Sequence, residues 1–401
     1  MTAPLVAGRD RLILFALWLM VFAASSQVII ISPILPEISV SLSIPASLQG
    51  TLVTAYSLAL SLFALIAGPI SDKLGRRRIL LVGSGFMMMA LLAHGLVFDY
   101  TSMLLVRAVA GAAGGVLSGS TVAYVGDYFP YERRGWANGW VVSGIAFGQI
   151  VGIPIGKLLA EQFGFLWPFL MFAVVMAGAF FLVLWFVPQP EVRLDARKLT
   201  VASALARYRD LLRIAVVRNA IFTYFVMFAA LGLYVIYLPT WLQTDVQVGP
   251  KSIAAVFAVG GLANVITSPW AGQLSDRIGR KPLVIASCIG FAVVMVSTTF
   301  ITTGPVSAML LFGSAMVMVA LRLSPLQSLV SSLVTADRRG MLMSMTVGIG
   351  QLGIGIGSAV AGVIYATSRG YLNNTLLSAI AILVMAVMVA YLLPEPKDAD
   401  A

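Results

Sequence analysis

The chain alternates between long apolar runs and short polar segments. Each run has about 20 residues or more, the length that an α-helix needs to cross the hydrocarbon core of a bilayer. The runs predict twelve membrane-spanning helices, at about 12–35, 47–69, 79–98, 102–126, 136–159, 165–187, 219–241, 252–271, 283–303, 306–330, 341–366 and 371–393. The pattern therefore indicates an all-α polytopic membrane protein.

The first run has some features of a cleaved signal peptide. Arg9 and Arg11 precede it, and the small residues Ala23 and Ala24 follow its first half. However, the run continues through Ile31, which is too long for the apolar region of a signal peptide. We therefore predict that it is retained as the first helix.

Composition supports the membrane assignment and argues against an enzyme. Hydrophobic residues make up 60% of the 401 positions and charged residues 10%, whereas a soluble domain has about 25% charged residues. The sequence has one cysteine, Cys288, and one histidine, His94. We expect no intrachain disulfide, metal, cofactor or enzymatic activity, and we interpret Cys288 as a small core residue.

The distribution of basic residues predicts the orientation. If both termini are cytoplasmic, 21 of the 26 Lys and Arg residues fall in cytoplasmic segments. Lys157, Lys251 and Arg369 then lie near the outer face, and Arg107 and Arg322 lie inside helices. This asymmetry follows the positive-inside rule and accounts for the net charge of +10 without a nucleic-acid partner. We expect a multi-pass protein of a bacterial inner (plasma) membrane.

The two halves of the sequence are related. Asp72 matches Asp276 at an offset of 204, and Pro36 matches Pro239 at 203. The segment 132–135 (ERRG) matches 337–340 (DRRG) at an offset of 205. A repeat of this kind predicts two six-helix bundles, 1–187 and 219–401, related by an axis along the membrane normal.

A polar segment, 188–218, joins the two predicted bundles. It contains seven basic residues and a spacing of apolar residues typical of a short amphipathic helix on the inner leaflet. Two interpretations remain open. The segment either bridges two halves that move, or it is a solvated linker.

Several motifs identify a family. The turn 68–78 (GPISDKLGRRR) is echoed at 272–282 (GQLSDRIGRKP), and the fourth helix carries 107–114 (RAVAGAAG). The fifth helix carries 148–156 (GQIVGIPIG), and the first ends with 32–37 (SPILPE). Over nearly its whole length the chain resembles the major facilitator superfamily, and the last two motifs resemble the twelve-helix drug:proton antiporter branch. Compared with the motif of that branch, the segment 148–156 has its proline one position later and a single glycine in place of the final glycine pair.

The resemblance implies a charged cytoplasmic latch. In the family, a loop aspartate, a following arginine and an acidic residue at the end of helix 4 hold the cytoplasmic side closed in the outward-facing state. The matching residues here are Asp72, Arg76 and Asp127. In the second half Asp276 and Arg280 remain, but Ser332 stands at the third position, so the second latch should be weaker.

Glycines on helices 5 and 11 predict close helix packing. Helix 5 has them at every fourth position, and helix 11 has a shorter version. These residues are Gly144, Gly148, Gly152, Gly156, Gly350, Gly353 and Gly357, with Pro154 among the first group. We expect these faces to meet helices of the opposite half.

Arg107 and Arg322 are the leading candidates for a substrate site. A charge inside a membrane helix costs several kcal/mol unless it faces protein or water, so each indicates function. The resemblance implies that helices 1, 4, 7 and 10 line a cavity, which would place both arginines on it. The alternatives are a structural hydrogen-bond hub for Arg107 and snorkelling to the inner face for Arg322.

Uncharged side chains complete the predicted cavity. They are polar residues at mid-helix depth and aromatic residues: Gln27, Asn264, Gln351, Tyr56, Tyr124, Trp140, Tyr234 and Tyr237. Two cations in an apolar and aromatic cavity suit an amphipathic or anionic organic solute.

We therefore expect a secondary transporter, working as a monomer, that exports a small organic compound by alternating access and is coupled to protons. An importer of an organic anion, an uncoupled facilitator, and a non-transporting receptor or assembly factor are the alternatives. Coupling is the open point, because no Asp or Glu lies at mid-depth and Glu37, Asp127 and Glu161 are all at helix ends. We expect His94 at the surface, and a substrate that carries the proton on its own ionisable group.

Overall fold

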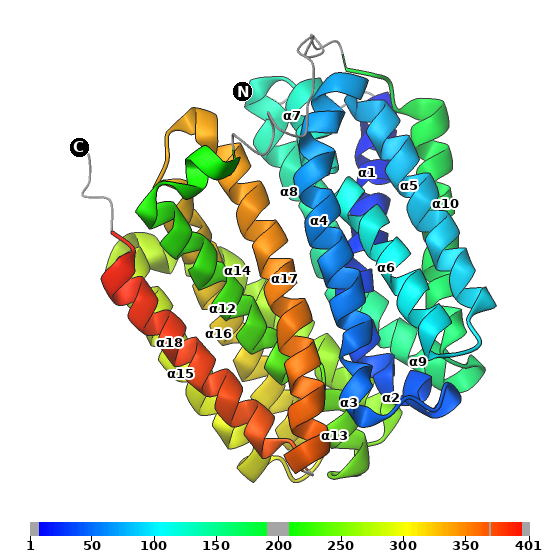
Figure 1. The fold of residues 1–401 in the computed structure, drawn as a ribbon. Helices are drawn as coiled ribbons and strands as arrows, with labels where there is room; N and C mark the ends of the chain where they lie inside the picture. Colours follow the sequence, from blue (N-terminus) through cyan, green and yellow to red (C-terminus); the bar gives the residue numbers. More distant parts are fainter. Residues whose placement is uncertain (1–7, 191–207, 369, 395–401) are drawn as a thin grey trace.

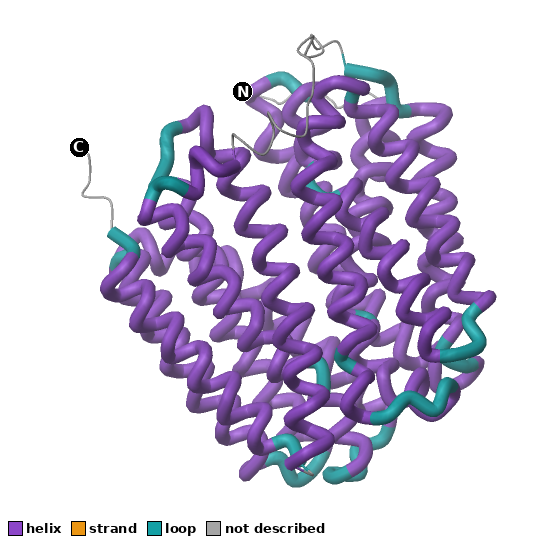
Figure 2. The backbone as a smooth tube through the Cα atoms, viewed as in Figure 1, coloured by secondary structure: helices purple, strands orange, loops and turns teal. Residues whose placement is uncertain are grey.

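The computed structural model describes residues 8–190, 208–368 and 370–394 (Figure 1). Helices and short connections make up this part of the chain, and it contains no strand (Figure 2). Twelve helical spans are long and apolar enough to cross a membrane, which confirms the predicted fold class. Orientation across the membrane remains a prediction, Arg369 lies outside the described residues, and so does most of the predicted linker helix.

The first bundle contains the first six spans. Its elements are α1 (Gly8–Ile29), α2 (Ile31–Ser41), α3 (Ala46–Gln49), α4 (Thr51–Leu74), α5 (Arg76–Ala93), η1 (His94–Leu96), α6 (Tyr100–Leu117), α7 (Ser120–Tyr128), α8 (Tyr131–Phe147), η2 (Gly148–Gly152), α9 (Ile153–Phe163) and α10 (Leu166–Phe186). Helices of this bundle pack mainly on one another, with α4 on α6 and α1 on both α8 and α10.

The second bundle repeats the arrangement. Its elements are α12 (Ala215–Val235), α13 (Leu238–Thr244), α14 (Pro250–Ile278), α15 (Arg280–Ile301), α16 (Pro305–Ser331), α17 (Ala336–Ser368) and α18 (Leu372–Leu392). Here α12 packs on α17, and α14 and α15 both pack on α16. The exact domain boundaries remain a prediction.

Prolines break the first and seventh spans at corresponding places. Pro33 follows the break at Ile30 between α1 and α2, and its ring crowds the carbonyl four residues earlier. Pro239 begins α13 just after the break at Ile236 and Tyr237. Without an N–H group, Pro239 cannot donate to the carbonyl of Val235, so the seventh span cannot continue as a regular α-helix.

The fourth and fifth spans are also irregular. Gly119 takes a φ of +76° between α6 and α7, a conformation that favours glycine. In the fifth span the five residues of η2 form a π-helical turn directly before Pro154. Pro154 has no N–H for the carbonyl of Ile150, which favours the wider turn at this point.

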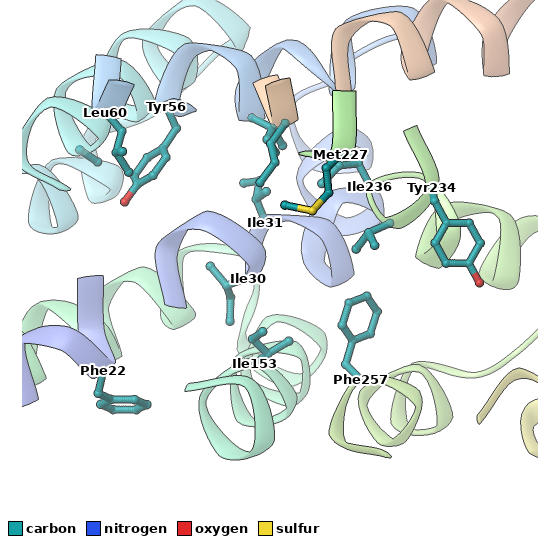
Figure 3. Close-up of a cluster of buried hydrophobic side chains, with 14 of the residues drawn as sticks. Phe22, Ile30, Ile31, Tyr56, Leu60, Ile153, Met227, Tyr234, Ile236 and Phe257 are labelled. Atoms are coloured by element: carbon teal, nitrogen blue, oxygen red, sulfur yellow. The ribbon is translucent and has the colours of Figure 1, made fainter. Parts of the chain in front are cut away.

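The two bundles meet most closely at the end of the molecule opposite the termini. We call the end with residues 8 and 394 the terminal end and the opposite end the far end (Figure 1). Across the bundles, α17 packs on α3 and α4, α14 on η2 and α9, and α13 on α2. Ile30, Ile153, Ile236 and Phe257 belong to the buried cluster between these elements (Figure 3). Toward the terminal end, α4 and α17 diverge (Figure 1).

Candidate functional site

Arg107 lies in the middle of the first bundle and is completely buried. Its Nη2 donates to the backbone carbonyl of Gln27 at 2.9 Å, and its guanidinium carbon lies 4.3 Å from the centre of the Tyr56 ring. A cation over an aromatic face is stabilised by the ring quadrupole. Arg107 therefore joins α6 to α1 and α4.

This cluster keeps unused hydrogen-bonding groups. Among the residues that the structure describes, Nε and Nη1 of Arg107 have no hydrogen-bond partner, and neither have the side-chain Oε1 and Nε2 of Gln27. Buried polar groups normally have partners, so such groups call for an explanation. Arg107, Gln27 and Tyr56, which the sequence nominated separately, lie together in one polar site.

Arg322 forms a second buried cationic site, in the second bundle. Its side chain is 1% exposed, and its guanidinium carbon lies 4.8 Å from the centre of the Phe291 ring. Nε and Nη1 again have no hydrogen-bond partner in the described part of the chain. The side chain of Arg322 therefore lies inside the second bundle and does not extend to a membrane surface.

A small cavity lies beside Arg322, between α12 and α16. Its volume is about 20 Å³, which is enough for one water molecule. Besides Arg322, its walls are apolar: Met227, Phe228, Leu231, Val319 and Leu323. The cavity therefore has room for one water-sized polar group against the guanidinium, with apolar side chains around it.

The other predicted cavity residues are dispersed. Tyr124 is buried and donates to the carbonyl of Pro188 at 2.8 Å, and buried Tyr234 shares a hydrogen bond with Thr298 at 2.9 Å. Asn264 and Gln351 are half-buried, whereas Trp140 is 56% exposed. A role for these residues in substrate binding remains a prediction.

Part of the predicted latch is an ion pair inside the first bundle. Nε of Arg76, at the start of α5, lies 2.6 Å from Oδ2 of Asp127, near the end of α7. Nη1 of Arg76 also donates to Ser71 at 3.0 Å. Asp276 is exposed and Arg280 half-buried, while the side chain of Asp72 lies outside the described residues.

The expectation that the glycines of helices 5 and 11 meet the opposite half is wrong. A Cβ at Gly144, Gly148 or Gly152 would touch residues of α1, one at Gly156 would touch Ile30 just after α1, and one at Gly353 or Gly357 would touch α12. The first set of contacts lies within the first bundle and the second set within the second bundle. Other glycines face the opposite half, among them Gly50, Gly348, Gly355 and Gly362. The spacing in sequence shows that a face is small but does not show which helix it meets.

One titratable residue is placed differently from expectation, and a second has a partner that the sequence did not predict. His94 is buried, not at the surface, and stacks on Phe169 with ring centres 3.9 Å apart. Lys157 is buried and forms an ion pair with Glu37, joining α9 to α2. The other carboxylate oxygen of Glu37 is buried without a hydrogen-bond partner. The position of Lys157 within an apolar run was the available signal for this pair.

The chain is similar to known membrane transporters in sequence and in fold. The family model of the Major Facilitator Superfamily matches residues 17–321 and 220–401. The MFS-type transporter YwfA of Bacillus subtilis is 28% identical over 90% of this chain and 87% of its own length. The multidrug resistance protein MdtG of Serratia proteamaculans is 27% identical over 72% of each chain. The crystal structure of a D-xylose-proton symporter superposes with a TM-score of 0.81 at 16% identity, covering 96% of this chain and 98% of its own.

Proposed function

We propose that this chain, which belongs to the Major Facilitator Superfamily, exports a small amphipathic or anionic organic compound by alternating access. The observation that carries the proposal is Arg322, a buried guanidinium with two unpartnered nitrogens beside an apolar cavity. A buried cation of this kind costs free energy unless it serves a ligand or a structural partner. The similarity to a multidrug resistance protein supports efflux.

The positive-inside pattern supports a cytoplasmic terminal end. In that orientation the far end faces outward. Because the bundles pack together at the far end and diverge toward the terminal end, the structure corresponds to an inward-facing state. A substrate would then enter from the cytoplasm and reach Arg322 between α12 and α16.

Coupling follows from the charge of the substrate. Moving one negative charge outward releases about 2.3 kcal/mol per 100 mV of an inside-negative membrane potential. A substrate that releases its proton in the cytoplasm, leaves as the anion and takes up a proton outside has the same net effect, in charge and protons, as export of the neutral acid with one proton entering. On this scheme the arginines bind the anion, and the pH dependence of transport follows the pKa of the substrate.

A protein carboxylate is the alternative carrier of the proton. Two transported analogues with different pKa values distinguish the schemes when transport is measured across pH. We expect each analogue to show a midpoint near its own pKa. A common midpoint for both, lost in Asp127→Asn or Glu37→Gln, would assign the proton to the protein.

An organic-anion importer or an uncoupled facilitator is the second candidate, because a buried guanidinium binds an anion whichever way the cycle runs. Counterflow in proteoliposomes, with matched anionic, neutral and cationic solutes, tests the proposal. We expect exchange of amphipathic anions in preference to their neutral and cationic analogues. Exchange restricted to cations would contradict the role given to Arg322, and no exchange of any solute would favour a receptor or assembly factor.

A further inference from the structure

A buried hydroxyl joins the two bundles at their helix breaks. Oγ of Ser32, in α2, donates to the carbonyl of Val235 at 2.8 Å and also lies 3.3 Å from the carbonyl of Ile236. Ser32 and Val235 are repeat partners, because they are separated by the same 203 positions as Pro36 and Pro239. The two broken helices therefore touch at equivalent points of the two halves.

The acceptor of this bond exists because of a proline. In a regular helix the carbonyl of Val235 would accept from the N–H of residue 239, which is Pro239 and has none. A buried carbonyl without a partner costs free energy, so it favours an outside donor. Ser32 of the opposite bundle supplies that donor.

Tyr237 makes a second connection between the bundles. Its hydroxyl donates to the carbonyl of Ala46 at 2.7 Å and accepts from the N–H of Gly50 at 2.9 Å. The side chain is fully buried. One phenol oxygen thus satisfies two backbone groups at the start of the second membrane span, at α3 and just before α4, across the boundary between the bundles.

A third connection lies between α4 and α17. Oγ1 of Thr54 donates to the carbonyl of Gly355 at 2.6 Å. Glycines make this approach possible, because a Cβ at Gly50 would lie 1.9 Å from the carbonyl oxygen of Ser358. A Cβ at Gly362 would lie 2.8 Å from the carbonyl oxygen of Ser47. The backbones of the two bundles are in direct contact here.

We propose that Ser32, Thr54 and Tyr237 form an outer lock, a set of neutral hydroxyls that holds the far ends of the bundles together. The direction in which the lock faces rests on the proposed function. Ser32 and Thr54 donate from the first bundle to carbonyls of the second, and Tyr237 donates from the second bundle to a carbonyl of the first. Separation of the far ends therefore breaks every bond. Because none of the three side chains is charged at ordinary pH, neither salt nor moderate pH changes should open the lock.

The lock is tested by distances between spin labels on the two bundles. Exposed Val40 and Lys251 lie at the far end of opposite bundles, and exposed Lys73 and Arg277 lie at the terminal end. Each pair is replaced by labelled cysteines in full-length protein carrying Cys288→Ser, reconstituted in lipid. The measurement requires no substrate, so it remains informative even if every transport assay fails.

Tyr237→Phe, Ser32→Ala and Thr54→Val each remove donors across the boundary. We expect each to raise the ratio of far-end-open to far-end-closed molecules, by roughly fivefold per hydrogen bond lost. The terminal-end distance should shorten in the same molecules. The matched controls are Tyr234→Phe and Ser39→Ala, whose hydroxyls bond to Thr298 and to Leu35 within their own bundles.

Gly50→Ala provides an independent test, since its added methyl group acts as a wedge against Ser358 without removing a donor. We expect the far end to open in this variant as well. Unchanged far-end distances in Tyr237→Phe and Ser32→Ala would overturn the proposal, as would equal changes in the two controls. If the lock variants open while no solute exchanges in wild-type liposomes, the lock stands and the transport function fails.

Discussion

At the scale of single residues, buried charges dominate the account. Sequence reasoning identified Arg107 and Arg322 because a charge within an apolar run is conspicuous. It did not identify the pairing of Lys157 with Glu37, since residues 120 positions apart meet only once helices are packed. It also placed His94 at the surface, whereas the ring is buried against Phe169.

The buried pair should contribute strongly to stability once it has formed. Removing one partner leaves an uncompensated buried charge, so we expect Glu37→Ala to lower the free energy of unfolding by about 3 kcal/mol. Unfolding of purified protein in detergent measures this loss. The comparison is Glu161→Ala, an exposed carboxylate one turn after Lys157 on α9. Its weaker charge interaction with Lys157 predicts a smaller loss.

A double variant separates charge burial from packing. Glu37→Leu with Lys157→Met removes both charges and keeps apolar volume, and we expect it to recover most of the stability lost in Glu37→Ala. No recovery would show that Glu37 acts through contacts other than the ion pair.

At the scale of helices, the apolar runs predicted all twelve spans, because each run must match the thickness of a bilayer. Repeated prolines accompany the breaks in helices 1 and 7, but the π turn of η2 and the break at Gly119 depend on local backbone geometry. The partners of the glycine faces depend on helix rotation, which periodicity alone does not determine. For this reason the glycines of the fifth and eleventh spans were expected, wrongly, to face the opposite bundle.

The glycine contacts within a bundle lead to a stability prediction. In α8, a Cβ at Gly144 would lie 2.8 Å from the carbonyl oxygen of Trp18, and one at Gly139 would meet nothing within 4 Å. We expect Gly144→Ala to destabilise the protein by about 1–3 kcal/mol through overpacking. Gly139→Ala should be neutral or stabilising by about 0.5–1 kcal/mol. Thermal unfolding of the two variants compares them, and equal midpoints would contradict the packing of α8 on α1.

The N-terminus of α6 gives a prediction about pH. Asp99 caps this helix, and hydrogen bonds from the Ser102 hydroxyl and backbone N–H lower the pKa of the exposed Asp99 carboxyl. Its contribution is present above the unfolded-state pKa and is lost as the pH falls through the lowered folded-state pKa. Below about pH 4, we expect the thermal midpoint of the wild type to fall slightly more steeply with decreasing pH than that of Asp99→Asn, because only the wild type loses the contribution of this carboxylate. An identical acid dependence in both proteins would assign that loss to other groups.

At the scale of the whole molecule, two six-helix bundles with different contacts at their two ends suit an alternating-access transporter. The internal repeat predicted this arrangement, since matching landmarks recur across the halves. The contacts between the bundles could not be predicted, because they involve backbone carbonyls and small residues without a distinctive sequence pattern. The pairing of Arg76 with Asp127, by contrast, was implied by the family resemblance, although its place inside one bundle was not.

The latch prediction belongs to this scale. Asp127→Asn removes the charge that pairs with Arg76. Because the family resemblance implies that this charge also holds the cytoplasmic side closed in the outward-facing state, we expect a shift toward the inward-facing state with substrate recognition retained. Labelling of cysteines introduced on the terminal-end halves of α4 and α17 should become faster from the cytoplasmic side. Unchanged labelling together with unchanged transport would mean that the charges near the turn 68–78 serve only to set the orientation of the chain in the membrane.

Binding and counterflow of one organic anion by purified wild type, Arg322→Lys and Arg322→Ala test the central claim most directly. We predict that Arg322→Ala abolishes both, whereas Arg322→Lys keeps a part, because the point charge survives and the planar donor fork does not. Measuring binding and thermal unfolding on the same preparations separates recognition from misfolding. A folded Arg322→Ala protein that binds and exchanges the anion as tightly and as fast as wild type would contradict the account.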